Sequence, residues 1–245
     1  MDKQTLWKFS AETELIKLLK ENISLQEIIT RNKISDEAQS KKIIMCCDGR
    51  CPRNGDEISL AGSGILMDGK ALEKFIKEIG DATITSHSDC GAAKLAFSML
   101  TPEDAAEFVD ADEFTKKWAL SIAHQYGLGY KHIEATDFIE KIHHERGIIL
   151  DSTLKFHPSI FRGMPNMFIA NSPRFANDEY VQTVATVLTG IAFGDHGFGE
   201  FLTSEDPFYI LIAGRDKEEE TKLVDICSKA VLSYGDSVVV KSCCL

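Results

Sequence analysis

The chain has little of what marks membrane, fibrous or disordered proteins. It contains no 18 consecutive uncharged apolar residues, so no stretch predicts a membrane-spanning helix. Only 17 Gly and 6 Pro occur in 245 residues, which excludes collagen-like and low-complexity chains. No basic patch interrupts the formal net charge of -11, and this charge repels nucleic acids and anionic membrane surfaces. Because no apolar run near residue 1 resembles a secretory signal, we expect a cytoplasmic protein.

The chain also lacks the even set of cysteines that a disulfide framework needs. It has seven, and in a reducing compartment such residues are typically thiols or metal ligands. Four of them fall in the first half, at Cys46, Cys47, Cys51 and Cys90. Ser242 stands fourth from the end, where a prenylation box needs Cys, so we interpret the tail as unmodified.

Hydrophobic periodicity predicts an α/β fold with a mainly parallel sheet flanked by helices. The predicted strands are short apolar or β-branched runs at 42–47, 58–66, 82–86, 148–150, 167–170, 208–213 and 237–240. The predicted helices lie at 3–31 (as two helices), 71–79, 92–100, from 101 onward, 114–126, 178–193 and 217–232.

Two of the predicted strands end in side chains that bind metals. Cys46 ends one strand, and His87 and Cys90 directly follow another. Ligand sites in parallel sheets gather at the carboxyl ends of strands, and zinc prefers thiolate and imidazole ligands. Asp48 lies on the same side of an extended segment as Cys46, and Arg50 could hold its carboxylate in a bidentate pair. The sequence therefore predicts a zinc site with an acidic group beside it.

These residues resemble the β-class carbonic anhydrases over roughly residues 15 to 100. The matching strings are Cys46-Cys47-Asp48-Gly49-Arg50 and His87-Ser88-Asp89-Cys90-Gly91-Ala92-Ala93-Lys94. Between them, Gly55-Asp56-Glu57-Ile58-Ser59-Leu60-Ala61-Gly62 is similar to the family's Gly-Asp segment before an Ala-Gly turn.

The resemblance implies a function and a role for each matching residue. Cys46, His87 and Cys90 would bind Zn²⁺, and Asp48 with Arg50 would form a dyad that controls the fourth position on the metal. The implied reaction is the reversible hydration of carbon dioxide to bicarbonate by a metal-bound hydroxide, without an organic cofactor. The implied assembly is a homodimer or an internally duplicated pseudo-dimer.

The sequence departs from the family pattern at several positions. Residue 49 is Gly where the family usually has a hydroxyl residue, and Ser59-Leu60 stands where an Arg-Asn pair is common. The segment between Arg50 and His87 is also shorter than usual. Enzymes of this fold that hydrolyse carbon disulfide or carbonyl sulfide share the same ligands, so these substrates stay open.

Two further interpretations belong to other classes of protein. A closed site with structural zinc and a partner-binding C-terminal half would have the same ligands. Cys47 and Arg53 have the Cys-x5-Arg spacing of cysteine phosphatases, although Pro52 lies inside that loop. His143-His144-Glu145 is predicted to lie on a helix, as part of a solvated charged face.

The second half suggests a degenerate repeat of the first. Residues 167–174 can be laid on 43–50, and 208–214 on 84–90, in both cases without the metal-binding side chains. We therefore divide the chain into an N-terminal helical arm (1–40), a zinc-binding α/β unit (41–165) and a C-terminal α/β extension or degenerate repeat (166–245).

Overall fold

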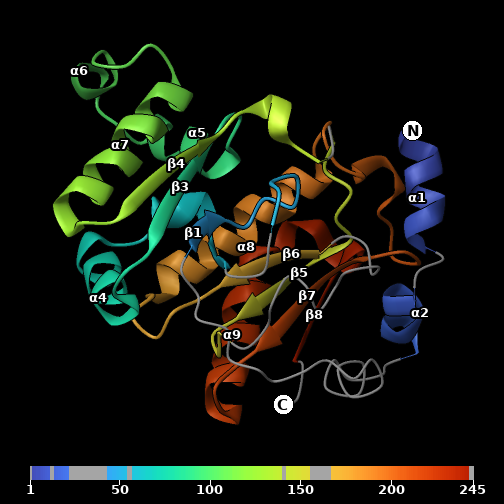
Figure 1. Cartoon of the computed structure of the whole chain (residues 1–245). Coiled ribbons are helices and arrows are strands. Elements are labelled where there is room, and N and C mark those ends of the chain that lie inside the picture. Colours follow the sequence, from blue (N-terminus) through green and yellow to red (C-terminus); the bar gives the residue numbers. More distant parts are fainter. Residues whose placement is uncertain are drawn as a thin grey trace.

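The computed structural model describes residues 2–11, 14–21, 43–53, 57–139, 142–154 and 167–242. They form an α/β protein with two four-stranded sheets flanked by helices (Figure 1). All neighbouring strands in both sheets are parallel. The predicted α/β class with parallel pairing is confirmed. None of the described helices combines the length and the apolarity needed to cross a bilayer.

The first sheet has the strand order β2-β1-β3-β4. Its strands are β1 (Ile43–Cys46), β2 (Glu57–Leu60), β3 (Thr83–His87) and β4 (Gly129–Ile133). The helical elements of this part are η1 (Ala61–Gly64), α4 (Gly69–Ile79), α5 (Gly91–Ser98), α6 (Pro102–Ala105), α7 (Ala111–Tyr126) and η2 (Ala135–Asp137).

The second sheet has the strand order β6-β5-β7-β8. Its strands are β5 (Gly147–Asp151), β6 (Met167–Asn171), β7 (Phe208–Ala213) and β8 (Val238–Ser242). Its helical elements are α8 (Asp178–Phe193), η4 (Gly199–Phe201), α9 (Lys217–Ala230) and η5 (Leu232–Ser237). Two helices, α1 (Lys3–Ala11) and α2 (Glu14–Lys20), precede both sheets. The part of the predicted N-terminal helical region from residue 22 onward lies outside the described residues.

Local chemistry explains most of these boundaries. The central strands β5 and β7 are short, largely apolar runs that are buried on both faces, as expected for parallel sheets covered by helices, and β3 is buried as well although four of its five residues are polar. Asp110 caps the first turn of α7, and Gly127 ends this helix in the left-handed conformation. Strand β4 is not predicted from the sequence, because this edge strand alternates exposed and half-buried residues before the buried Ile133 and includes Lys131 and His132.

The two sheets share one topology. In each, the first strand in the sequence pairs with the second on one side and the third on the other, and the fourth lies at the outer edge. β5 therefore corresponds to β1 and β6 to β2, so the predicted alignment of residues 167–174 with 43–50 is wrong. Short apolar strands align easily in sequence, and only the pairing shows which are equivalent. β7 does take the place of β3. The sequence places β5 in the 41–165 unit, but this strand pairs within the second sheet.

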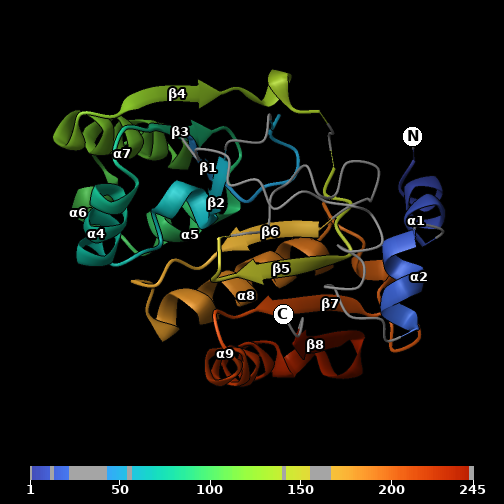
Figure 2. The same cartoon turned by 60° about the horizontal axis from the view of Figure 1, so that its bottom comes forward.

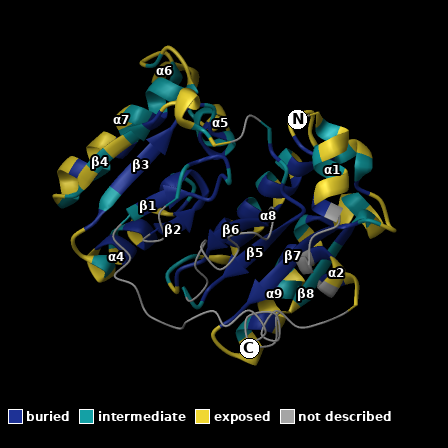
Figure 3. Cartoon of the chain, turned by 45° about the vertical axis from the view of Figure 1, so that its right-hand side comes forward, coloured by how far each residue is buried: buried dark blue, intermediate teal, exposed yellow. Residues whose placement is uncertain are grey.

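The two units meet along the edge strands β2 and β6 (Figure 2). The Ser59 backbone N–H donates to Asn171 Oδ1 at 2.8 Å, and the Ala61 N–H donates to Tyr180 Oη at 3.2 Å. Side chains of the second unit thus pair the edge-strand N–H groups that a lone sheet would leave open. Burial is continuous across this junction, with α8 between the two units (Figure 3).

Helix α1 is attached to the second unit through a buried arginine. Arg146 is fully buried, and its guanidinium carbon lies 3.6 Å from the centre of the Trp7 ring. Its Nη1 donates to Ser10 Oγ at 3.3 Å, and its Nη2 lies 3.6 Å from Asp206. Burial lowers the pKa of Arg146 to about 10, so the side chain stays charged at neutral pH and depends on the ring above it.

We expect Trp7→Ala to lower the free energy of unfolding by about 2–3 kcal/mol, because it removes the ring that covers a buried charge. Phe9→Ala on the same helix removes a ring that is 64% exposed and should cost less than about 0.5 kcal/mol. Urea unfolding followed by circular dichroism measures both variants. Equal effects would contradict this account of the helix attachment.

Candidate metal centre

The parallel pairing of β1 with β3 brings the predicted ligands together. Cys46 is the last residue of β1, His87 is the last residue of β3, and Cys90 caps the N-terminus of α5. All three side chains are at most 4% exposed. Their ligand atoms lie within 4.8 Å of one another, so the structure assembles the three residues into a candidate metal site.

The distances fit a tetrahedral ion. Cys46 Sγ and Cys90 Sγ are 3.9 Å apart, and two sulfurs bound to one tetrahedral zinc would lie about 3.8 Å apart. His87 Nδ1 bonds the Ser88 carbonyl at 2.8 Å, and its Nε2 is buried with no hydrogen-bond partner. A histidine whose Nδ1–H donates to a carbonyl offers the lone pair of Nε2 to a metal. The donor set therefore fits zinc.

Contacts among the three side chains set their protonation. The hydrogen bond with Cys46 and burial raise the pKa of the Cys90 thiol well above its usual value, so this thiol keeps its proton. Hydrogen bonds from Cys47 and Cys90 lower the pKa of the Cys46 thiol well below its usual value. Burial disfavours the charged His87 ring, yet the neighbouring Cys46 thiolate raises its pKa to about 9. The Gly62 N–H also donates to Cys46 Sγ at 3.3 Å, from a turn in which Gly62 has a φ of +55°. A metal ion that binds here would displace the proton that the imidazole holds beside the Cys46 thiolate.

The predicted dyad is present and buried. Arg50 donates to Asp48 through its backbone N–H (2.9 Å to Oδ1), its Nε (3.1 Å to Oδ1) and its Nη2 (2.8 Å to Oδ2). Burial alone would raise the pKa of Asp48, but the hydrogen bonds from Arg50 lower it, so the carboxylate is ionised. Asp48 Oδ2 lies 3.9 Å from His87 Nε2, beside the ligands and held by Arg50.

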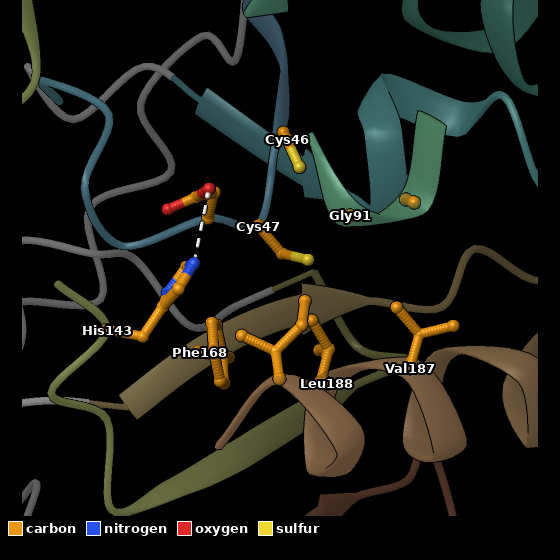
Figure 4. A pocket seen from close by; sticks show the side chains of 10 residues that line it. Cys46, Cys47, Gly91, His143, Phe168, Val187 and Leu188 are labelled. Atoms are coloured by element: carbon orange, nitrogen blue, oxygen red, sulfur yellow. Dashed lines mark ion pairs between the residues drawn. The ribbon is translucent and has the colours of Figure 1, made fainter. Parts of the chain in front are cut away.

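Two residues of the candidate metal centre, His143 and Glu145, are not predicted from the sequence as site residues. His143 and Glu145 were predicted to lie on a solvated helix, but the segment from 142 to 146 is not helical and both side chains are buried. His143 Nε2 lies 3.8 Å from Asp48 Oδ2, as the dashed line in Figure 4 shows, and its Nδ1 bonds Glu145 Oε2 at 3.2 Å. The predicted helix is wrong because a tertiary contact fixes this segment, the bond from the His143 N–H to the His196 carbonyl at 2.9 Å.

Glu145 explains the glycine at position 49. A Cβ on Gly49 would collide with Glu145 Oε1, so the carboxylate occupies the space of a side chain there. The departure from the family pattern at residue 49 and the buried Glu145 are therefore one coupled feature. In the sequence, the glycine at position 49 was the sign that another group occupies the space of its side chain.

Two cavities adjoin the centre. A small one of about 10 Å³ is lined by Cys46 and Asp48 on one side and by Phe168, Val187 and Leu188 of the second unit on the other (Figure 4). This is room for about one water molecule. A larger cavity of about 310 Å³ lies next to it and is lined by charged side chains that include Arg50 and Lys94.

The geometry does not support a cysteine phosphatase. The hydrogen bond between Cys47 and Cys46, together with burial, raises the pKa of Cys47 well above its usual value, so this thiol stays protonated. Arg53 donates to the Cys46 carbonyl at 2.8 Å, the Asp48 carbonyl at 3.1 Å and Ser59 Oγ at 2.6 Å. Its guanidinium thus holds the turn that follows β1 and is not free to bind a phosphate.

Two groups of described side chains could hold a metal ion, namely Cys46, His87 and Cys90, and Asp48, His143 and Glu145. Both include a residue at the carboxyl end of β1, so the second unit has no comparable centre of its own among its described residues. At the corresponding edge, Ser152 Oγ donates to Glu219 at 2.7 Å, and Arg215 pairs with the same carboxylate. In comparisons with known proteins, no family model, no curated protein and no solved structure matches the chain.

We expect the purified protein to contain about one zinc ion per chain, and Cys90→Ser or His87→Ala to remove it, because either change leaves two ligands. Cys227→Ala changes an equally buried cysteine in the second unit and should keep the metal. Elemental analysis by mass spectrometry measures the metal content. Full zinc in either ligand variant would contradict the assignment.

We expect Gly49→Ala to destabilise the fold by about 1–3 kcal/mol, because the new Cβ displaces the buried Glu145 carboxylate. In the Gly49→Ala/Glu145→Ala double variant the space is free, so the glycine substitution should add little to Glu145→Ala alone. A double-mutant cycle by chemical unfolding measures the coupling. Additive effects would show that the two residues do not compete for space.

Proposed function

We propose that the protein catalyses the zinc-dependent, reversible hydration of carbon dioxide. One observation carries the proposal: two sulfurs and the free nitrogen of His87 converge beside a carboxylate, Asp48, that Arg50 holds through its backbone N–H, its Nε and its Nη2. When bound there, zinc would lower the pKa of a water molecule to about 7 and so supply a nucleophile at neutral pH.

The chain's own residues would bind and orient the reactants. Ionised Asp48 is a hydrogen-bond acceptor only, so it can orient a proton-bearing nucleophile toward the small cavity that it lines. Arg50 fixes Asp48, and Arg50 itself is held by Asp89 at 3.2 Å and by the Phe138 ring at 4.8 Å. Phe168 and Leu188 keep the opposite wall apolar, which suits an uncharged substrate.

We further infer that the second unit takes the place of a second subunit. It repeats the strand order of the first, it carries no metal group among its described residues, and it supplies the wall that faces Cys46. A fused pseudo-dimer in which one copy binds metal and the other completes the pocket accounts for these features.

A second candidate is the hydrolysis of carbonyl sulfide or carbon disulfide. The observation that favours it is the composition of the small cavity: the side chains that α8 and β6 contribute are all apolar and offer bicarbonate no hydrogen-bond donor. Sulfide release, measured on the same protein as carbon dioxide hydration, separates the two activities.

We expect carbon dioxide hydration, followed by stopped flow, to rise with pH between about 6.5 and 9, because the deprotonated nucleophile is the reactive form. Asp48→Asn should lower kcat/KM by about 100-fold and leave the zinc content unchanged. Asp225→Asn on α9 changes an exposed carboxylate and serves as the matched control. Bound zinc without activity at any pH would favour a structural metal and contradict the proposal.

A further inference from the structure

The two cavities beside the candidate metal centre share part of their lining. Four residues border both the cavity of about 10 Å³ and the cavity of about 310 Å³, namely Gly91, His143, Val187 and Ile191. We call these four residues the neck. Because the small cavity touches Cys46 and Asp48 and the large one does not, the neck stands between the metal centre and the outer cavity.

The neck is narrow because two helices approach each other there. A Cβ on Gly91, the first residue of α5, would lie 2.8 Å from Ile191 Cδ1 on α8. Val187 and Ile191 are four residues apart and so share one face of α8. Figure 4 shows Val187 of α8 and Gly91 of α5 on opposite sides of the pocket.

The fourth neck residue, His143, is held in place by residues that do not belong to the neck. The His143 backbone bonds the His196 carbonyl at 2.9 Å, and its ring is held by Glu145 at 3.2 Å. The ring also packs on Phe168, with 5.6 Å between the ring centres. With His143 held in this way and Gly91 part of the helix backbone, the aliphatic side chains of α8 decide how wide the passage is.

We propose that Ile191 is a specificity-determining residue that limits access to the metal centre to rod-shaped triatomic molecules. This inference deepens the proposed function and rests on it for the identity of the substrate. It defines the substrate class as linear molecules with a carbon between two oxygen or sulfur atoms. The small cavity has room for about one water molecule, so such a rod would lie with one end in this cavity and the other in the neck, and we expect a ring or a branched carbonyl compound to be excluded.

The chemistry of the two sides agrees with this division. The outer cavity holds the charged groups Arg50, Asp89 and Lys94, which are already paired with one another. Beyond the neck, the wall from the second unit is apolar. A narrow molecule without net charge loses little hydration on entering such a space.

The test uses the full chain with Co²⁺ in place of zinc, because the visible spectrum of Co²⁺ reports each ligand that reaches the metal. Azide, a linear triatomic anion whose charge the bound Co²⁺ would compensate, is compared with imidazole, a flat ring. We expect azide to change the spectrum of the wild type and imidazole to bind at least about tenfold more weakly than in Ile191→Ala, while the azide affinity changes little. Ile226→Ala on α9 trims an equally half-buried isoleucine away from both cavities and should match the wild type.

A variant that narrows the neck tests the inference even if Ile191→Ala disturbs the fold. Gly91→Ala adds a methyl group against Ile191 Cδ1, so it should weaken azide binding, and Gly91→Ala/Ile191→Ala should restore it. Wild-type protein that binds imidazole as readily as Ile191→Ala would overturn the inference. So would Gly91→Ala protein that binds azide normally.

The failure of this inference differs from that of the proposed function. Protein that selects azide over imidazole through Ile191 but does not hydrate carbon dioxide supports the neck and contradicts the activity. Protein that hydrates carbon dioxide but shows no selection contradicts only the neck, and protein that binds no Co²⁺ contradicts both.

Discussion

The parallel pairing of β1 with β3 is the constraint on which the site depends. Cys46 and His87 are 41 positions apart in the printed sequence, and they meet because their strands run side by side in the same direction and end at the same edge. Cys90 joins them because α5 begins directly after that edge. An antiparallel or shifted pairing would separate the Cys46 sulfur from His87 and Cys90, which follow each other closely after β3.

Burying charge at this edge requires partners for every group. Asp48 and Arg50 are each 5% exposed, and they compensate each other through a bidentate ion pair. His143 and Glu145 form a second buried pair beside them. Removing one member of such a pair leaves an unpaired buried charge, which costs more than the pair itself contributes. The site is therefore a connected network, and a change in one member affects the orientation of Asp48.

The second unit covers one side of this network of buried charged residues. It contributes α8 and β6 to the cavity wall, and the segment that leads into β5 carries His143 and Glu145. The same segment continues to Arg146, whose guanidinium stacks on Trp7 of α1. One short stretch of chain thus connects the attachment of the N-terminal helix to the neighbourhood of the candidate metal centre.

The amino-acid sequence was enough to predict the α/β class, most strands and helices, and the three candidate ligands with the Asp48–Arg50 pair, because each of these depends on local periodicity or on short spacing at strand ends. It could not show that β6 corresponds to β2, since short apolar strands look alike until their hydrogen bonds are known. It also could not place His143 and Glu145, whose burial comes from contacts with Asp48, Gly49 and residues near 196. These points became visible in the folded protein, because strand order, the approach of two helices and the pairing of buried charges depend on residues that are distant along the chain.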